Sequence, residues 1–194
     1  MNKENLISLI LNETGAEVFN LGQHPYESRL AYISMIVSLA WADGSIDDRE
    51  REIIESIAQT AGSDIAMQLD NIIQQNQRFC LEKYDIWIKN LDNKSLKIGL
   101  MVDMFLTSFA DSVCMQSETI YMKYIAGKLG IDDELYNIIR KNVEEYIKQK
   151  SGDSQAVSYE DGIAHQRENR AETEEEQTFR RIVNNLVKTL LLTA

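Results

Sequence analysis

The sequence predicts an all-α protein: a helical bundle of two pseudo-repeated helix–turn–helix units, followed by a C-terminal amphipathic helix. Three observations lead to this fold class. Apolar residues recur at helical spacing along most of the 194 residues. One proline and nine glycines leave few chain breaks, which favours long helices over many short strands. A long stretch of the chain also repeats itself at a fixed interval.

The N-terminal region, residues 1–24, is expected to form one helix that packs on the bundle. We predict this helix over residues 3–19. Pro25 follows a short break and favours the start of the next helix. The apolar residues on one face of the first helix are Leu6, Ile7, Ile10 and Leu11.

The main helical domain is expected over residues 25–149, with its first repeat at about 29–76. A helix over Tyr26–Ala42 is apolar on most sides, so it is expected at the centre of the bundle. The pair Asp43-Gly44 ends this helix.

The helix after this turn carries its own start and stop signals. Asp47 with Glu50 three residues later forms the Asp-x-x-Glu pattern of a capping box, and Gly62 is suited to end the helix. Shorter helices are predicted near residues 64–76 and 81–91.

The second repeat, at about residues 97–149, matches the first after a shift of 68 places without a gap. AWADGSIDDREREIIESIAQTAG then aligns with SFADSVCMQSETIYMKYIAGKLG. We interpret this match as an internal duplication in which two units share one core. A last helix is expected over 132–149. Identical small or acidic residues at matched places are Ala42 with Ala110, Asp43 with Asp111, Glu50 with Glu118, Ala58 with Ala126, and Gly62 with Gly130.

The C-terminal part divides into a polar linker, residues 150–177, and an amphipathic helix, residues 178–194. Such an apolar stripe must be covered by another surface. Docking on the chain's own bundle and self-association both remain open, and membrane attachment is the weakest alternative because an acidic run adjoins the helix. The stripe consists of Phe179, Ile182, Val183, Leu186, Val187, Leu190 and Leu191.

The composition excludes several classes of partner. The formal net charge is −11, and no segment forms the basic stripe that nucleic-acid binding needs. Divalent cations and protein partners are the natural counterparts. No secretory signal or membrane-spanning stretch is found, so a cytoplasmic protein is expected. Cys80 and Cys114 lack metal-ligand spacing and are expected to be small core residues.

No enzyme motif is present, and we expect a protein without catalytic activity. His24 and His165 stand apart from any Cys, Asp or Glu at ligand spacing. Phosphate-binding loops and nucleophile motifs are missing as well. The two tryptophans and most methionines fall at helical core positions, which is typical of filler rather than of a cofactor site.

The candidate site is an acidic corner that occurs twice. Asp43 and Asp111 each end a helix, and Glu50 and Glu118 each lie in the first turn of the next. If the two units pack about a pseudo-twofold axis, these four carboxylates converge, with Asp47 beside the first pair. Oxygen ligands without imidazole or thiolate suit Ca²⁺ or Mg²⁺.

Helix capping is the alternative explanation of these acids. Asp47 accounts for Glu50 through the capping box, and Asp43-Gly44 is an ordinary turn pair. In the second unit Ser112 replaces Gly44, and Met115 replaces the capping Asp47, yet Glu118 persists. The persistence of Glu118 favours a further role for it.

The run YISMIVSLAWADGSIDDREREIIESIAQTAG resembles the hallmark segment of the TerB-like family, linked to tellurite resistance. The resemblance covers roughly residues 25–149 and includes the degenerate second unit. It implies an all-helical stress-response module whose acidic residues bind metal, and these positions match Asp43, Glu50, Asp111 and Glu118, with Asp47 in the first unit only. No J-domain His-Pro-Asp motif is present, so the co-chaperone activity of related proteins is not implied.

Two functions therefore remain open from the sequence. The first is a module that binds a divalent cation and a protein partner. The second is a metal-independent interaction or oligomerisation scaffold that uses the C-terminal helix. The residues expected to bind a partner in that helix are Phe179, Ile182, Val183, Leu186 and Leu190.

Overall fold

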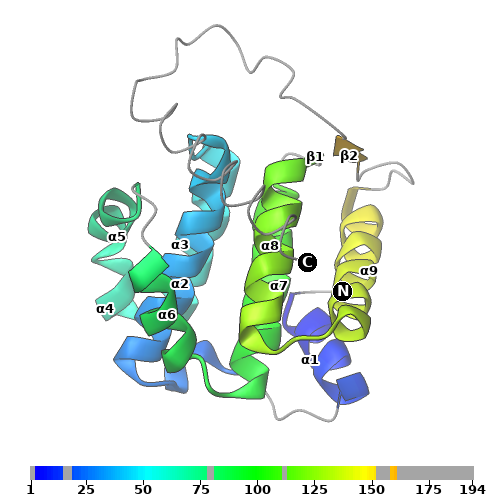
Figure 1. Cartoon of the computed structure of the whole chain (residues 1–194), viewed down its shortest axis with the longest axis horizontal. Helices are drawn as coiled ribbons and strands as arrows, with labels where there is room; N and C mark the ends of the chain where they lie inside the picture. The colour runs from blue at the N-terminus through cyan, green and yellow to red at the C-terminus, as the bar shows by residue number, and fades with distance from the viewer. Residues whose placement is uncertain (1–2, 15–18, 78–80, 111–112, 152–157, 161–194) are drawn as a thin grey trace, which may run out of the picture.

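The computed structural model describes residues 3–14, 19–77, 81–110, 113–151 and 158–160, and this part of the chain is helical, as predicted (Figure 1). Two strands of three residues each, β1 and β2, pair in parallel and were not predicted. The elements in chain order are α1 Lys3–Thr14, η1 Leu21–Gln23, α2 Tyr26–Ala40, η2 Trp41–Asp43, α3 Asp48–Ala61, α4 Ser63–Ala66, α5 Leu69–Gln75, α6 Leu81–Asn90, α7 Lys94–Ser108, β1 Val113–Met115, α8 Gln116–Leu129, α9 Asp133–Ser151 and β2 Ser158–Glu160.

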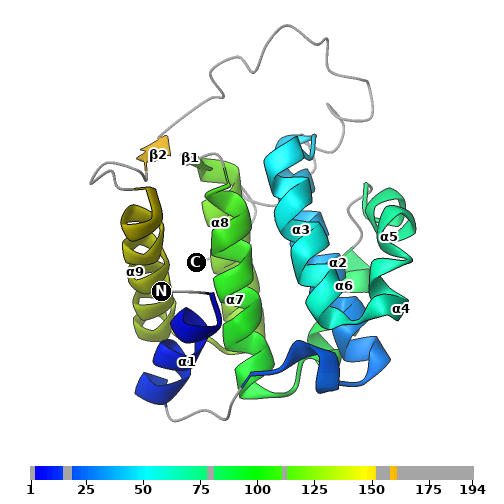
Figure 2. The same cartoon turned by 180° about the vertical axis from the view of Figure 1, so that it is seen from behind.

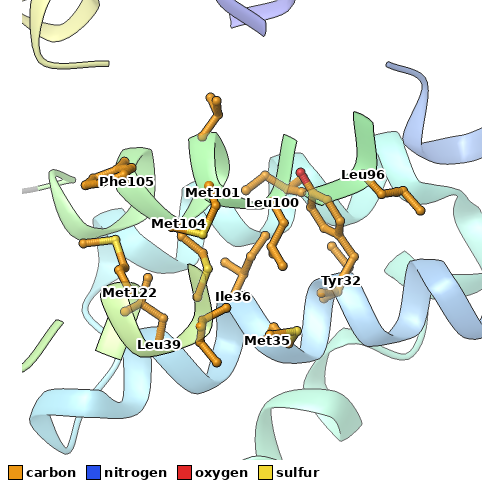
Figure 3. Close-up of a cluster of buried hydrophobic side chains, with 14 of the residues drawn as sticks. Tyr32, Met35, Ile36, Leu39, Leu96, Leu100, Met101, Met104, Phe105 and Met122 are labelled. Carbon is orange, nitrogen blue, oxygen red and sulfur yellow. The ribbon is translucent and has the colours of Figure 1, made fainter. Parts of the chain in front are cut away.

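Helices α2 and α7 form the centre of the core. Every residue from 31 to 40 is buried, which explains why the sequence of α2 is apolar on most sides. Side chains of α2 and α7 interleave along their contact, and Met122 of α8 joins them at one end (Figure 3). The methionines Met35, Met101, Met104 and Met122 are all fully buried, so they are core residues, as expected.

The flanking helices are arranged reciprocally around this central pair. Helix α3 packs against α2 and α7, while α8 packs against α7 and α2. Helix α1 lies against α7 and α9, on the side of the molecule away from α4 and α5 (Figure 2). The buried face of α1 consists of the predicted residues Leu6, Ile7, Ile10 and Leu11.

The ends of two matched helices are set by glycine. Gly62 follows α3 with φ of 130°, and Gly130 follows α8 with φ of 73°, both backbone conformations that favour glycine. At Gly130 the N–H of Ile131 donates to the carbonyl of Ala126, 2.9 Å away, as in a Schellman motif. The predicted helix stop at Gly62 is therefore confirmed, and its match Gly130 likewise follows the end of a helix.

Two predicted helices differ from the structure. The helix expected over 64–76 is divided into α4 and α5 at Met67 and Gln68, and the Met67 side chain is 80% exposed. The Gln68 amide donates to the carbonyl of Asp64, 2.8 Å away, and the Tyr26 hydroxyl donates to the Gln68 side chain. At the other end of the domain, Phe19 lies outside α1, although the first helix was predicted to reach it.

Within the ranges that the structure describes, no helix combines the length and apolar character needed to cross a membrane.

Candidate functional site

The first acidic corner is the turn between α2 and α3. Helix α2 tightens into η2, and Gly44 then takes a left-handed conformation with φ of 98°. Its N–H donates to the carbonyl of Trp41, 3.0 Å away. A side chain at this φ would be strained, so glycine permits the turn that follows Asp43. The backbone of Asp43 is described, whereas its side chain lies outside the described part.

Asp47 and Glu50 form the predicted capping box at the start of α3. The backbone N–H of Glu50 donates to the Asp47 carboxylate over 2.8 Å, and the N–H of Asp47 donates back to the Glu50 carboxylate over 2.8 Å. These bonds satisfy N–H groups that a helix start otherwise leaves unpaired. Glu50 is only 5% exposed. The capping interpretation of these two acids is therefore confirmed.

The second acidic corner lies between α7 and α8 and contains β1. Glu118 lies in the first turn of α8, three residues after Met115, as Glu50 lies three residues after Asp47. Glu118 is also 5% exposed. Methionine has no side-chain oxygen, so Met115 cannot accept the bond that Asp47 accepts. Asp111 falls outside the described residues.

The two corners lie at the same end of the bundle. The turn η2, which ends at Asp43, packs against α8, which carries Glu118 in its first turn. In both overall views, the starts of α3 and α8 are at the upper end of the molecule, and β1 lies beside the start of α8 (Figures 1 and 2). The first helix turns that carry Glu50 and Glu118 thus lie at the same end of the molecule.

The described acids do not form a metal site by themselves. Among the residues that the structure describes, no group of three or more His, Cys, Asp or Glu could hold a metal ion. Of the five predicted ligands, only Asp47, Glu50 and Glu118 have described side chains. A site at this end of the bundle therefore needs Asp43 or Asp111 as well.

A buried polar cluster that sequence reasoning missed links α1, α2 and α7. Asp103 of α7 is fully buried, and Lys3 of α1 lies 2.9 Å from one of its carboxylate oxygens. The Tyr32 hydroxyl donates to the other oxygen over 2.8 Å. Burial, together with the neighbouring Asp103 charge, raises the pKa of Tyr32 well above its usual value. The signal was Asp103 itself, a charged residue within the apolar run IGLMVDMFL.

A second buried polar contact lies between α6 and α8. The Tyr121 hydroxyl donates to the Tyr84 hydroxyl, and the two rings meet edge-on with their centroids 5.8 Å apart. Burial raises the pKa of both phenols. Both tyrosines belong to the buried core, so we assign this pair to it.

The residues predicted to bind a partner, Phe179, Ile182, Val183, Leu186 and Leu190, lie outside the described residues, as do His165 and Cys80. His24 is half-buried, and this burial lowers its pKa.

No protein-family model, curated protein or solved structure matches this chain.

Proposed function

We propose that the protein is a non-enzymatic module, similar to the TerB-like proteins of tellurite resistance, that binds a divalent cation between its two acidic corners and acts with a protein partner in a stress response. The observation that carries the proposal is the packing of η2, which ends at Asp43, against α8, the helix that carries Glu118 in its first turn.

The buried carboxylates at the end of the bundle where α3 and α8 start support cation binding. Glu50 and Glu118 are both nearly buried, and a buried carboxylate is costly unless a positive charge or N–H donors balance it. The N–H of Asp47 that donates to Glu50 is one such donor. A hard divalent ion with oxygen ligands would add positive charge beside several carboxylates at once, with water completing its coordination. The net charge of −11 adds a long-range attraction for cations.

The duplication is part of the proposal. Two units that arose from one ancestor would place matched residues about a pseudo-twofold axis, and the reciprocal packing of α3 on α7 and α8 on α2 is the arrangement such units would have. Matched acids then face each other across that axis. Because Ser112 and Met115 depart from the first unit, the proposed site is asymmetric.

Calorimetric titration of the full chain with Ca²⁺, Mg²⁺ and Mn²⁺ tests the cation. We expect saturable binding of one of these ions that Glu118→Gln weakens by about tenfold or more, since one ligand charge is lost. Glu134→Gln is the matched control, because Glu134 also lies in a first helix turn, that of α9, but is exposed. Absent binding, or equal loss in both variants, would overturn the proposal.

The confirmed capping box favours a second candidate, a metal-independent scaffold for interaction or oligomerisation. Here the acids only cap helices, and the working surface is the segment 178–194. Truncation after Gly152, followed by light scattering and thermal unfolding, tests it. The scaffold predicts a smaller oligomer or a lower melting temperature. An unchanged assembly and stability would exclude this segment as an interface.

A further inference from the structure

The strand β2 connects the chain after α9 to the second acidic corner. It pairs in parallel with β1, with Val113 opposite Ser158, Cys114 opposite Tyr159 and Met115 opposite Glu160. Helices α8 and α9 lie between the two strands in sequence, so the chain returns to the place where α8 began (Figure 1).

Because of the position of β1, its pairing with β2 can affect the second acidic corner. β1 starts two residues after Asp111 and ends three residues before Glu118. It also contacts both α7 and α8. Whatever holds the backbone of β1 therefore also holds the first turn of α8.

The pairing is weak enough to open and close. A two-stranded sheet is only marginally stable in water, and parallel pairs are slightly less stable per residue than antiparallel ones. With three residues in each strand, only a few ladder hydrogen bonds can form. The free energy that separates the paired and unpaired states is accordingly small, within reach of a bound partner or a modification.

We propose that residues 158–160 form a releasable strap. In the paired state the strap fixes β1 and the first turn of α8. In the released state it frees the second acidic corner. This device goes beyond the proposed function, because it operates whether or not a cation binds.

A designed disulfide tests the pairing. Neighbouring strands lie about 4.8 Å apart, which is within the Cα separation that a disulfide spans. In a full chain with Cys80→Ser, the variant Tyr159→Cys should therefore form an intramolecular disulfide with Cys114 under mild oxidation. Gln166→Cys, in the same background, is the control and should not do so. A disulfide between two chains, or equal reaction of both variants, would overturn a strap formed within one molecule.

Hydrogen exchange tests the effect on the corner. Tyr159→Pro should break the ladder, because proline has no N–H and a fixed φ. We expect amide exchange in β1 and the first turn of α8 to quicken by at least about tenfold, with little change in α2. Gln166→Pro should leave these rates unchanged. Unaltered exchange in Tyr159→Pro, or the same change in the control, would contradict the strap.

Discussion

The two acidic corners have acidic residues at the same sequence spacing, but different contacts hold them in place. In the first, Asp47 and Glu50 bond to each other's backbone, and Gly44 turns the chain. In the second, Met115 takes the place of Asp47, and β1 pairs with β2. Yet Glu50 and Glu118 are equally buried, at 5% exposure. Reciprocal capping thus accounts for the position of Glu50 but not for that of Glu118.

The largest losses of stability are expected in the core between α2 and α7. Ile36 of α2 and Met104 of α7 occupy matched positions and are both fully buried. Each substitution to alanine should lower the free energy of unfolding by about 2–5 kcal/mol, through lost apolar contact and a residual cavity. Urea denaturation measures both. A loss below about 1 kcal/mol for either one would show that the units do not contribute alike.

The next largest loss of stability is expected at an aligned position where the two repeats have different residues. This position is Met35 in the first repeat and Asp103 in the second. Asp103→Met leaves the buried Tyr32 hydroxyl without its acceptor, which should cost about 1–3 kcal/mol. Adding Tyr32→Phe to this variant should recover part of the loss. Urea denaturation of both single variants and the double variant gives the coupling energy. Strictly additive losses would mean that the hydroxyl and the carboxylate do not act together.

Substitutions at the helix caps of the two corners should change the free energy of unfolding by about 1 kcal/mol, with opposite signs. Asp47→Ala removes the N-cap of α3 and should destabilise the fold by about that amount. Met115→Asp should gain up to about 1 kcal/mol, because it restores the Asp-x-x-Glu pattern before α8. Thermal unfolding of both variants measures these changes in stability. If Met115→Asp brings no gain, then residue 115 does not cap α8.

The smallest expected effect is on the pH dependence of folding stability, and it comes from an ion pair in the first repeat. The two terminal nitrogens of Arg29 donate to the two carboxylate oxygens of Asp64 over 2.7 and 2.8 Å, and this bonding lowers the pKa of Asp64. A lowered pKa in the folded state adds stability above about pH 4, and this stability is lost as the pH falls further.

The stability advantage of the wild type over Arg29→Met should therefore shrink between neutral pH and about pH 3. Lys97 occupies the matched position in the second unit, so Lys97→Met is the control. Urea denaturation at the two pH values decides the matter. An advantage that does not change with pH would mean that the Arg29–Asp64 pair contributes nothing in solution.

Much of the fold could be predicted because the sequence signals for its helix starts and ends involve only residues close together in the chain. The capping box at Asp47 and the stops at Gly62 and Gly130 depend on a few neighbouring residues. The break at Met67 could not be predicted, because DIAMQLDNIIQQ continues the helical spacing without Gly or Pro and Gln68 bonds to distant Tyr26. Strand pairing between residues 113–115 and 158–160 is likewise a long-range event.

The candidate site was harder to predict than the fold. Sequence spacing placed Asp43 and Glu118 at helix ends, but only the fold shows that η2 packs on α8. The charge of Asp103 was visible in an apolar run, yet its partners Lys3 and Tyr32 are distant in sequence. Side chains that meet through tertiary packing leave no local pattern.

The most direct test is anomalous X-ray scattering from crystals of the full chain grown with Mn²⁺. If the two corners share a cation, an anomalous peak will lie between η2 and the first turn of α8, within about 2.5 Å of carboxylate oxygens from both units. If there is no peak at that end of the bundle, and Glu50 and Glu118 bond only to their own helices, the two corners are separate caps and the cation proposal is wrong.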